Sequence, residues 1–204
     1  MRERYDLIIF LKMLEYIDNN FFDKKCSDKF FGNIRYISCQ FNQCDFQSAI
    51  FKSCKFIDCE FVNCNLSFID LDYSCFSNTI FNRCKIQGVD WTRAEWGNTV
   101  IRLPLAFIGC LLNHSTFFGL DLRNTDYSQS VLRNVDFREA VLNGSNFYNT
   151  DLEESLFHGT EIEKCNFKNA KNYVINIMAN RVKNSTFSLP EAMILLYHMD
   201  IIIE

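Results

Sequence analysis

Cysteine is the residue type in this 204-residue chain that most readily suggests chemistry, because ten are present. Six of them, from Cys39 to Cys84, lie multiples of five residues apart, whereas zinc sites usually pair cysteines at roughly two to four residues. The histidines stand alone in the sequence and complete neither a catalytic triad nor a metal-binding motif: His114, His158 and His198. A glycine-rich phosphate loop is also absent. The sequence therefore predicts no catalytic residues, no metal and no cofactor, and so a protein that is not an enzyme.

Acidic side chains are the second candidate for function, because they concentrate in one part of the chain. Residues 1–106 carry 13 basic and 13 acidic groups, whereas residues 107–204 carry 8 and 12. Between residues 119 and 163 only three arginines oppose nine acids, which we take as the candidate partner-binding residues: Asp121, Asp126, Asp136, Glu139, Asp151, Glu153, Glu154, Glu161 and Glu163. The net charge of −4 disfavours direct binding to nucleic acid, which usually requires a basic excess.

A five-residue period positions these side chains. Thirty of thirty-one successive steps of five, from Phe21 to Ile101 and, after a one-residue slip near residues 102–106, from Phe107 to Asn172, hold an apolar or aromatic residue, and all of these except Cys26 are large. Fifteen of these residues are Phe. Neither a helix, with a period near 3.6, nor a flat strand, with a period of 2, explains a period of five. A short internal repeat therefore organises most of the chain.

From Cys39 onward, small residues occupy most of the positions two before a large one, and eight cysteines are among them. Residues two apart on extended backbone point to the same side, so both sets should face inward. The cysteines then become small buried groups, with Cys39 and Cys59 in one column and Cys44, Cys64 and Cys84 in another. A disulfide or soft-metal ladder is the less favoured alternative for these columns.

The sequence resembles the pentapeptide-repeat family in stretches such as Cys44-Asp45-Phe46-Gln47-Ser48 and Thr150-Asp151-Leu152-Glu153-Glu154. The resemblance covers residues 21–172 and implies an all-β solenoid, a right-handed quadrilateral β-helix with four pentapeptides in each coil. Residues twenty apart should therefore stack. The expected columns are Tyr36, Phe56, Phe76, Trp96, Phe117, Phe137 and Phe157, and Phe51, Leu71, Trp91, Leu112, Leu132 and Leu152.

The two ends depart from the repeat. Apolar positions between residues 5 and 17 predict a short amphipathic helix, and we expect residues 1–20 to cap the open end of the rod. Residues 173–204 form the predicted tail. Ser188 and Glu191 have the spacing of a capping box and predict a helix over about 189–199, with a short strand at 201–203.

The tail is apolar on nearly every side, so a second copy of the chain should cover part of it. It resembles the ending of the Qnr and microcin-immunity pentapeptide proteins, which implies a C-terminal dimerisation helix. The expected dimer interface contains Leu189, Met193, Leu196, Tyr197, Ile201 and Ile203.

The resemblance also implies a function. Members of this subgroup bind DNA gyrase or topoisomerase IV and protect it from toxins or drugs, as acidic rods that compete with DNA. We therefore expect a cytoplasmic homodimer that binds one of these enzymes, with no membrane association. Qnr proteins carry projecting loops linked to quinolone protection, and a one-residue slip leaves no room for such a loop, which favours self-immunity to a peptide-like poison. The alternative is a non-enzymatic scaffold or interaction module with an unrelated partner.

Overall fold

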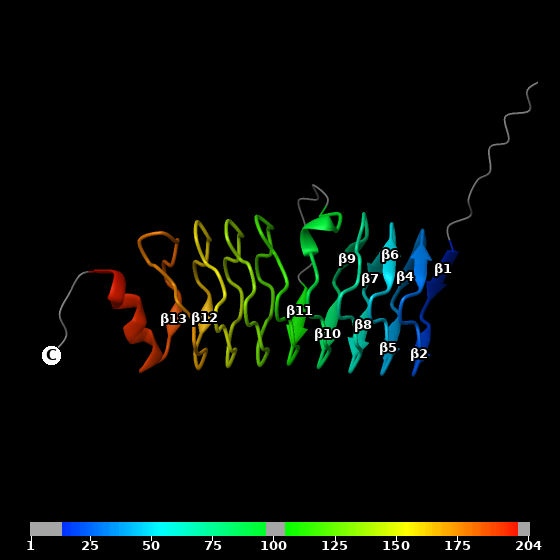
Figure 1. Cartoon of the computed structure of the whole chain (residues 1–204), viewed down its shortest axis with the longest axis horizontal. Helices are drawn as coiled ribbons and strands as arrows, with labels where there is room; N and C mark the ends of the chain where they lie inside the picture. Colours follow the sequence, from blue (N-terminus) through cyan, green and yellow to red (C-terminus); the bar gives the residue numbers. More distant parts are fainter. Residues whose placement is uncertain (1–13, 97–104, 200–204) are drawn as a thin grey trace, which may run out of the picture.

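The computed structural model describes residues 14–96 and 105–199, and shows an elongated rod of stacked coils with β1 at one end and the helix η2 at the other (Figure 1). The chain turns four corners in each coil, and hydrogen-bonded partners in adjacent coils are about twenty residues apart. All strand pairs are parallel. This is the right-handed quadrilateral solenoid that the sequence resemblance implies.

The four faces of the rod are numbered here in the order in which the chain meets them, and each is identified by its first inward residue: Tyr16, Phe21, Cys26 and Phe31. Face 1 contains β1 (Leu14–Ile17), β4 (Ile34–Ile37), β7 (Lys55–Ile57) and β9 (Cys75–Ser77). Face 2 contains β2 (Asn20–Phe22), β5 (Gln40–Asn42), β8 (Glu60–Val62), β10 (Ile80–Asn82), β11 (Ala106–Ile108), β12 (Asn166–Phe167) and β13 (Thr186–Phe187). Face 3 is built from isolated bridges, and face 4 contains β3 (Phe30–Gly32), β6 (Ile50–Lys52) and further bridges.

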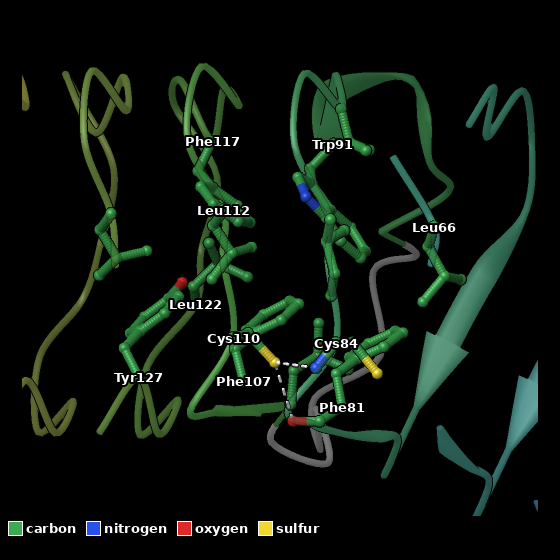
Figure 2. Packing of buried hydrophobic residues seen from close by; sticks show 14 of the residues in the cluster. Leu66, Phe81, Cys84, Trp91, Phe107, Cys110, Leu112, Phe117, Leu122 and Tyr127 are labelled. Atoms are coloured by element: carbon green, nitrogen blue, oxygen red, sulfur yellow. Dashed lines mark hydrogen bonds between the residues drawn. The ribbon is translucent and has the colours of Figure 1, made fainter. Parts of the chain in front are cut away.

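The core consists of columns in which equivalent large side chains stack along the rod (Figure 2). On face 2 the ring centroids of successive residues lie 4.5–5.5 Å apart and the rings are nearly parallel. This distance is close to the roughly 4.8 Å between neighbouring strands, so the stacking follows directly from the backbone pairing. The column contains Phe21, Phe41, Phe61, Phe81, Phe107, Tyr127, Phe147, Phe167 and Phe187.

The small inward residues do more than leave space, because they hydrogen-bond neighbouring coils together. The backbone N–H of Cys84 donates to Cys110 Sγ at 3.4 Å, and that thiol donates to the carbonyl oxygen of Phe81 at 3.3 Å. Ser130 makes the same two bonds with Cys110 N–H and the Phe107 carbonyl. Thiols and hydroxyls are therefore equivalent links in this position.

The corners explain how a chain with only seven glycines makes so many tight turns. The corner residue, two after an inward large residue, has positive φ in nearly every repeat, and most such positions hold residues other than glycine. Asn, Asp and Ser dominate, for example Asp58 (φ 53°) and Asn124 (φ 60°). Asn and Asp enter the left-handed region more readily than other side-chain-bearing residues, which makes them workable substitutes for glycine.

The slip near residues 102–106 is six residues, not one. Cys84 bonds to Cys110, 26 residues later, instead of to a residue 20 later. Phe107 stacks on Phe81, and Trp91 stacks on Phe117 with centroids 5.7 Å apart. The expected pairs Trp96–Phe117 and Trp91–Leu112 are therefore wrong. The six additional residues fall between Trp96 and Phe107, an interval that includes residues 97–104, which lie outside the described part of the chain.

The rod extends beyond both predicted limits. Leu14–Ile17 is strand β1, paired with β4, where the sequence predicts the end of a helix, and Tyr16 stacks on Tyr36. The remainder of the predicted helix lies outside the described residues. At the other end β13 pairs with β12, and Phe187 stacks on Phe167, so the coils continue past residue 172. Near Asn172 the apolar positions change, because Tyr173 and Ile175 are buried instead, although the pairing persists.

The C-terminal helix η2 covers Glu191–Met199 and is a 3-10 helix, two residues shorter at its start than expected. The described residues contain one other helix, η1 (Trp91–Arg93), which is a short 3-10 turn capped by Asp90. The hydroxyl of Ser188, predicted to cap η2, accepts a hydrogen bond from Asn169 N–H.

Candidate partner-binding surface

The nine acids of residues 119–163 form a ring around the rod rather than a patch on one side. The period of five carries successive repeats to successive faces, so acids from one sequence segment are distributed over all four. Face 1 carries Asp121, Glu161 and Glu163, face 2 carries Asp126, face 3 with its corner carries Asp151, Glu153 and Glu154, and face 4 with its corner carries Asp136 and Glu139.

Arginines neutralise about half of this ring. Arg123 and Arg138 each pair with the aspartate two residues before them, at 2.6 Å to Asp121 and 2.8 Å to Asp136. The hydrogen bond from Arg138 holds the pKa of Asp136 below its usual range. Exposed ion pairs of this kind add little stability, so their main effect is on the charge that a partner meets.

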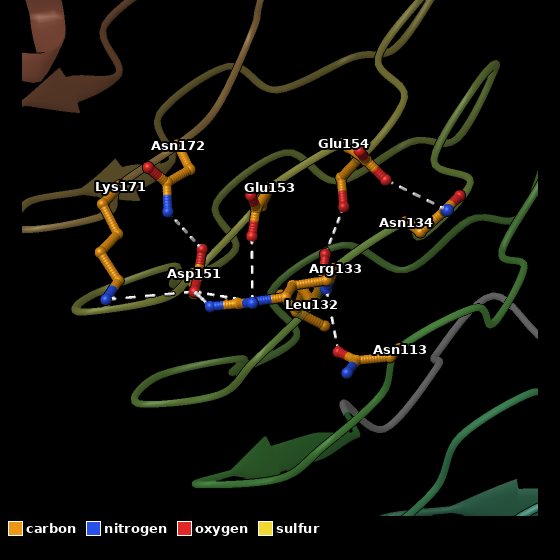
Figure 3. Close-up of polar contacts among 10 residues, drawn as sticks. Asn113, Leu132, Arg133, Asn134, Asp151, Glu153, Glu154, Lys171 and Asn172 are labelled. Carbon is orange, nitrogen blue, oxygen red and sulfur yellow. Dashed lines mark hydrogen bonds and ion pairs between the residues drawn. The ribbon is translucent and has the colours of Figure 1, made fainter.

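Arg133 organises the most connected group on face 3 (Figure 3). Its guanidinium contacts Asp151 at 2.6 Å and Glu153 at 3.1 Å, and Asn172 donates a hydrogen bond to Asp151 at 2.8 Å. Asp151 is buried, with 5% of its surface exposed, because the side chains of Arg133 and Asn172 lie against its carboxylate. Burial raises its pKa, but the hydrogen bonds from Asn172 and Arg133 outweigh this effect and hold the pKa below its ordinary value.

The other acids differ in how available they are. Asp126 accepts hydrogen bonds from Ser128 N–H and from Asn146, which itself accepts one from Asn166, so this carboxylate is part of a polar ladder on face 2. Within the described chain Glu139 and Glu163 make no ion pair, and Glu154 has Asn134 as its neighbour at 3.4 Å.

Sequence reasoning missed one important base, Arg181. Its guanidinium lies 2.6 Å from Glu161 in the preceding coil. Arg181 falls outside residues 119–163, and so outside the charge count that singled out the acids. The signal that identifies it is the period itself, because residues twenty apart are neighbours across coils.

The cysteine columns are buried and chemically quiet. Cys44, Cys64 and Cys84 stack as expected, and Cys110 joins them because of the longer coil. Burial raises the pKa of Cys59 to about 11 and that of Cys165 to about 12, which suppresses the reactive thiolate. All ten thiols are free, and no group of three potential metal ligands gathers among the residues the structure describes.

The C-terminal end of the rod is only partly covered by η2. Ile194 and Leu195 pack against the last coils, whereas Leu189 (75% exposed), Met193 (42%) and Tyr197 (77%) lie on the surface. Leu196 is half-buried. Of the expected interface residues, Ile201 and Ile203 fall outside the described part of the chain.

Comparison with protein-family models supplies the classification. The pentapeptide repeat region matches residues 34–103 and 103–167, well over half of the chain. The chain belongs to the pentapeptide-repeat family. A comparison of this pentapeptide-repeat protein with curated protein sequences found no match.

Among solved structures, this pentapeptide-repeat protein is similar in fold to QnrB1, described as a plasmid-mediated fluoroquinolone resistance protein. One trypsin-treated variant of QnrB1 aligns with a TM-score of 0.70 at 15% identity, over 94% of this chain and 98% of the other. A second trypsin-treated variant gives 0.62 at 16% identity over 93% and 99%, and full-length QnrB1 gives 0.54 at 16% over 92% and 100%. At these identities the likeness establishes the fold. Within the described part of the chain, no helix of this pentapeptide-repeat protein has the length and apolar character needed to cross a membrane.

Proposed function

We propose that this pentapeptide-repeat protein binds a type II DNA topoisomerase, DNA gyrase or topoisomerase IV, and protects it from a toxin or antibiotic. In this proposal it acts without catalysis, as a cytoplasmic homodimer joined through the C-terminal end, and it contacts the enzyme instead of nucleic acid. The resistance role named for QnrB1, a protein of similar fold, gives the proposal its direction.

The observation that carries the proposal is the acidic ring, in which three arginines oppose nine acids within residues 119–163. Surfaces that bind DNA are basic, and a rigid acidic rod presents a complementary potential to such a surface. The acids on all four faces resemble the distribution of phosphates around a duplex more than a patch on one side would. Glu139 and Glu163, which form no ion pair among the described residues, contribute the least compensated charge.

The exposed apolar end supports the dimeric part of the proposal. Leu189, Met193 and Tyr197 remain on the surface although η2 already covers the last coil through Ile194 and Leu195. A second copy related by a twofold axis would bury these side chains and place one acidic ring on each side of the dimer centre.

The class of poison stays open in this proposal. A one-residue slip argued against quinolone protection because it left no room for an interrupting segment. That argument no longer applies, because Phe81 and Phe107 stack across a coil of 26 residues. This coil has six additional residues between Trp96 and Phe107, which is room for an interrupting segment. Quinolones and peptide-like poisons therefore both belong in the test.

The test is a supercoiling and cleavage assay with purified gyrase and topoisomerase IV, with and without each poison. We expect inhibition of supercoiling or relief of poison-induced cleavage, weakened by added salt and by competing DNA. No effect of a folded protein at micromolar concentration on either enzyme would contradict the proposal.

A non-enzymatic scaffold with an unrelated partner is the second candidate, and the ion pairs favour it. Asp121, Asp136, Asp151, Glu153 and Glu161 are all paired with arginine, which reduces the field that a basic partner meets. Binding to a scaffold partner would not be displaced by DNA, which separates the two functions.

A further inference from the structure

Exposed apolar side chains collect on face 4 of the rod. From Leu14 to Leu156 the described chain exposes eleven large apolar side chains. Six of them belong to face 4 or to the corners at its two edges: Phe30, Ile50, Phe68, Tyr73, Phe118 and Leu156. Scattered apolar side chains are normal on a protein surface, but their concentration along one face marks an interaction site.

Two of these side chains occupy positions that disfavour them. Phe68 and Tyr73 are the corner residues on either side of face 4, at φ 61° and 57°, and are 59% and 66% exposed. A bulky aromatic residue in the left-handed region is unusual, because it has neither glycine's freedom nor the local hydrogen bonds of Asn. Their backbone strain and their exposure are both unfavourable in the free protein, and burial against a partner would recover the second.

Glycines reduce the number of side chains that project from the same surface. Four of the seven glycines in the chain lie on face 4 or its corners: Gly32, Gly88, Gly119 and Gly159. A Cβ atom on Gly88 would lie 2.6 Å from the ring of Phe68, so that ring extends over the corner of the next coil. A Cβ atom on Gly119 would meet nothing within 4 Å, so this glycine lies beneath open space beside Phe118.

Acids lie between the apolar side chains. One outward column of face 4 runs Phe30, Ile50, Asp70, then Asp90, Thr116, Asp136 and Leu156, so its middle is acidic and its ends are apolar. Arg93 is held by Asp70 and Asp72 at 3.3 and 2.7 Å, and Arg138 lies over the Phe118 ring at 5.7 Å. Across the face and its corners seven acids oppose four bases. The acids are Asp28, Asp70, Asp72, Asp90, Asp136, Glu139 and Glu154, and the bases are Lys29, Lys52, Arg93 and Arg138.

This charge decides among occupants. A second copy placed face to face would bring two acidic surfaces together, and nucleic acid or an anionic membrane would also be repelled. A protein surface with basic side chains set between apolar ones fits both features, since arginine also stacks well on exposed aromatic rings.

We propose that face 4 is a protein-docking surface for a partner segment that carries basic and apolar side chains, with Phe68, Tyr73 and Phe118 as its aromatic contacts. This inference rests on the proposed function, because it takes the topoisomerase as the partner. It assigns affinity to apolar contact on one face, in addition to the charge of the acidic ring.

The experiment compares two triple variants in binding to purified DNA gyrase and topoisomerase IV holoenzymes. The face 4 variant is Phe68→Asn, Tyr73→Asn and Phe118→Asn, where Asn suits the two left-handed corners. The matched control carries Phe22→Asn, Ile80→Thr and Tyr148→Asn on face 2, which are 63%, 38% and 40% exposed in the native protein. Circular dichroism and the unfolding midpoint verify that both variants fold.

We expect the face 4 variant to raise Kd about tenfold or more, as loss of aromatic anchors does at protein interfaces, and the face 2 variant to change Kd by less than about twofold. Equal affinities of wild type and face 4 variant would overturn the docking surface while leaving the proposed function intact. Equal losses in both variants would also overturn it, because the effect would not belong to face 4. If the wild type binds neither enzyme, the proposed function and this inference both fall.

Discussion

At the scale of single residues, the inward thiols act as hydrogen-bonding links between coils. The N–H of Cys44 donates to Cys64 Sγ, and that thiol donates to the carbonyl oxygen of Phe41 at 3.2 Å. We expect Cys64→Ser to keep both bonds, as Ser130 does elsewhere, and to change the free energy of unfolding by less than about 1 kcal/mol.

Cys64→Val is the informative contrast, because its volume suits the position and its side chain accepts no hydrogen bond. The buried N–H of Cys44 would lose its partner, at a cost of about 1–3 kcal/mol. Urea unfolding of the two variants measures the difference. Equal stabilities would show that the thiols only fill space.

The corner residues offer a second prediction at this scale. Lys164 has φ 59° and its side chain forms no ion pair among the described residues, so its backbone strain has no evident compensation there. We expect Lys164→Asn to stabilise the protein by about 0.5–1 kcal/mol, because Asn populates the left-handed region more easily. The control is Lys168→Asn. Lys168 directly follows the inward Phe167, so it lies one position before a corner and outside the left-handed region. This variant removes the same charge and should leave the unfolding midpoint nearly unchanged. A similar gain in both variants would point to charge instead of backbone conformation.

At the scale of elements, two carboxylates held by arginine make stability depend on pH: Asp136 pairs with Arg138 in its own repeat, and Asp151 pairs with Arg133 in the preceding coil. The pKa values of Asp136 and Asp151 are both below the usual range in the folded protein. The unfolded chain therefore takes up protons first as the pH falls. The stabilisation is complete above the unfolded pKa of about 3.9 and is lost as the pH falls through the lower folded values.

We therefore expect the thermal midpoint of the wild type to fall between about pH 5 and pH 2, and to fall less in the double variant Asp136→Asn, Asp151→Asn. Calorimetry at a series of pH values measures both curves. Parallel curves would show that these two carboxylates do not contribute to acid unfolding.

The elements also show where sequence reasoning succeeds and where it does not. The faces were predictable because every inward position repeats the same choice of large and small residue. The length of the interrupted coil was not predictable, since Ile101 satisfies the five-residue pattern although Phe107 is the residue that stacks on Phe81. Apolar spacing identifies candidates for the core, but backbone pairing decides among them.

The N-terminal limit of the rod was mispredicted for a related reason. Leu14 and Ile17 fit a helical pattern, yet β1 forms because β4 offers a strand edge to pair with.

The acids of the candidate site could be found from sequence, whereas their neutralisation depends on partners one coil away, such as Arg181 for Glu161. Counting charges along the chain does not detect such pairs.

At the scale of the whole molecule, the acidic ring should control affinity for the topoisomerase. Reversing Glu153, Glu154, Glu161 and Glu163 to Lys changes charge on faces 1 and 3, and we expect gyrase binding to weaken by about tenfold or more, with a smaller dependence on salt. A control with Glu15, Asp45, Asp58 and Glu60 reversed to Lys makes the same change in net charge near the other end, and like the first variant it contains one left-handed corner residue, Asp58. Unchanged affinity of the first variant would exclude the ring as the binding site.

The second prediction at this scale concerns assembly. Removing residues 189–204 deletes η2 and the exposed Leu189, Met193 and Tyr197, so we expect a dimer to become a monomer or to aggregate, because Phe187 and the last coil lose their cover. The double variant Leu189→Asp, Met193→Asp keeps that cover and should give a soluble monomer. Light scattering measures both, and a stable dimer in either variant would contradict the assigned interface.

The twenty-residue coil has a further consequence for how such a molecule changes over generations. A deletion of one full coil would shorten the rod by about 4.8 Å and leave every remaining face aligned, whereas a deletion of five residues would rotate one part of the surface by a quarter turn against the other. The length of the rod and the rotation of one part of its surface against the other can thus change independently, each in fixed steps. The coil across which Cys84 meets Cys110 shows that the register also survives an insertion that is not a multiple of five. Recognition surfaces on this scaffold can therefore be respaced or turned relative to each other without redesign of the core.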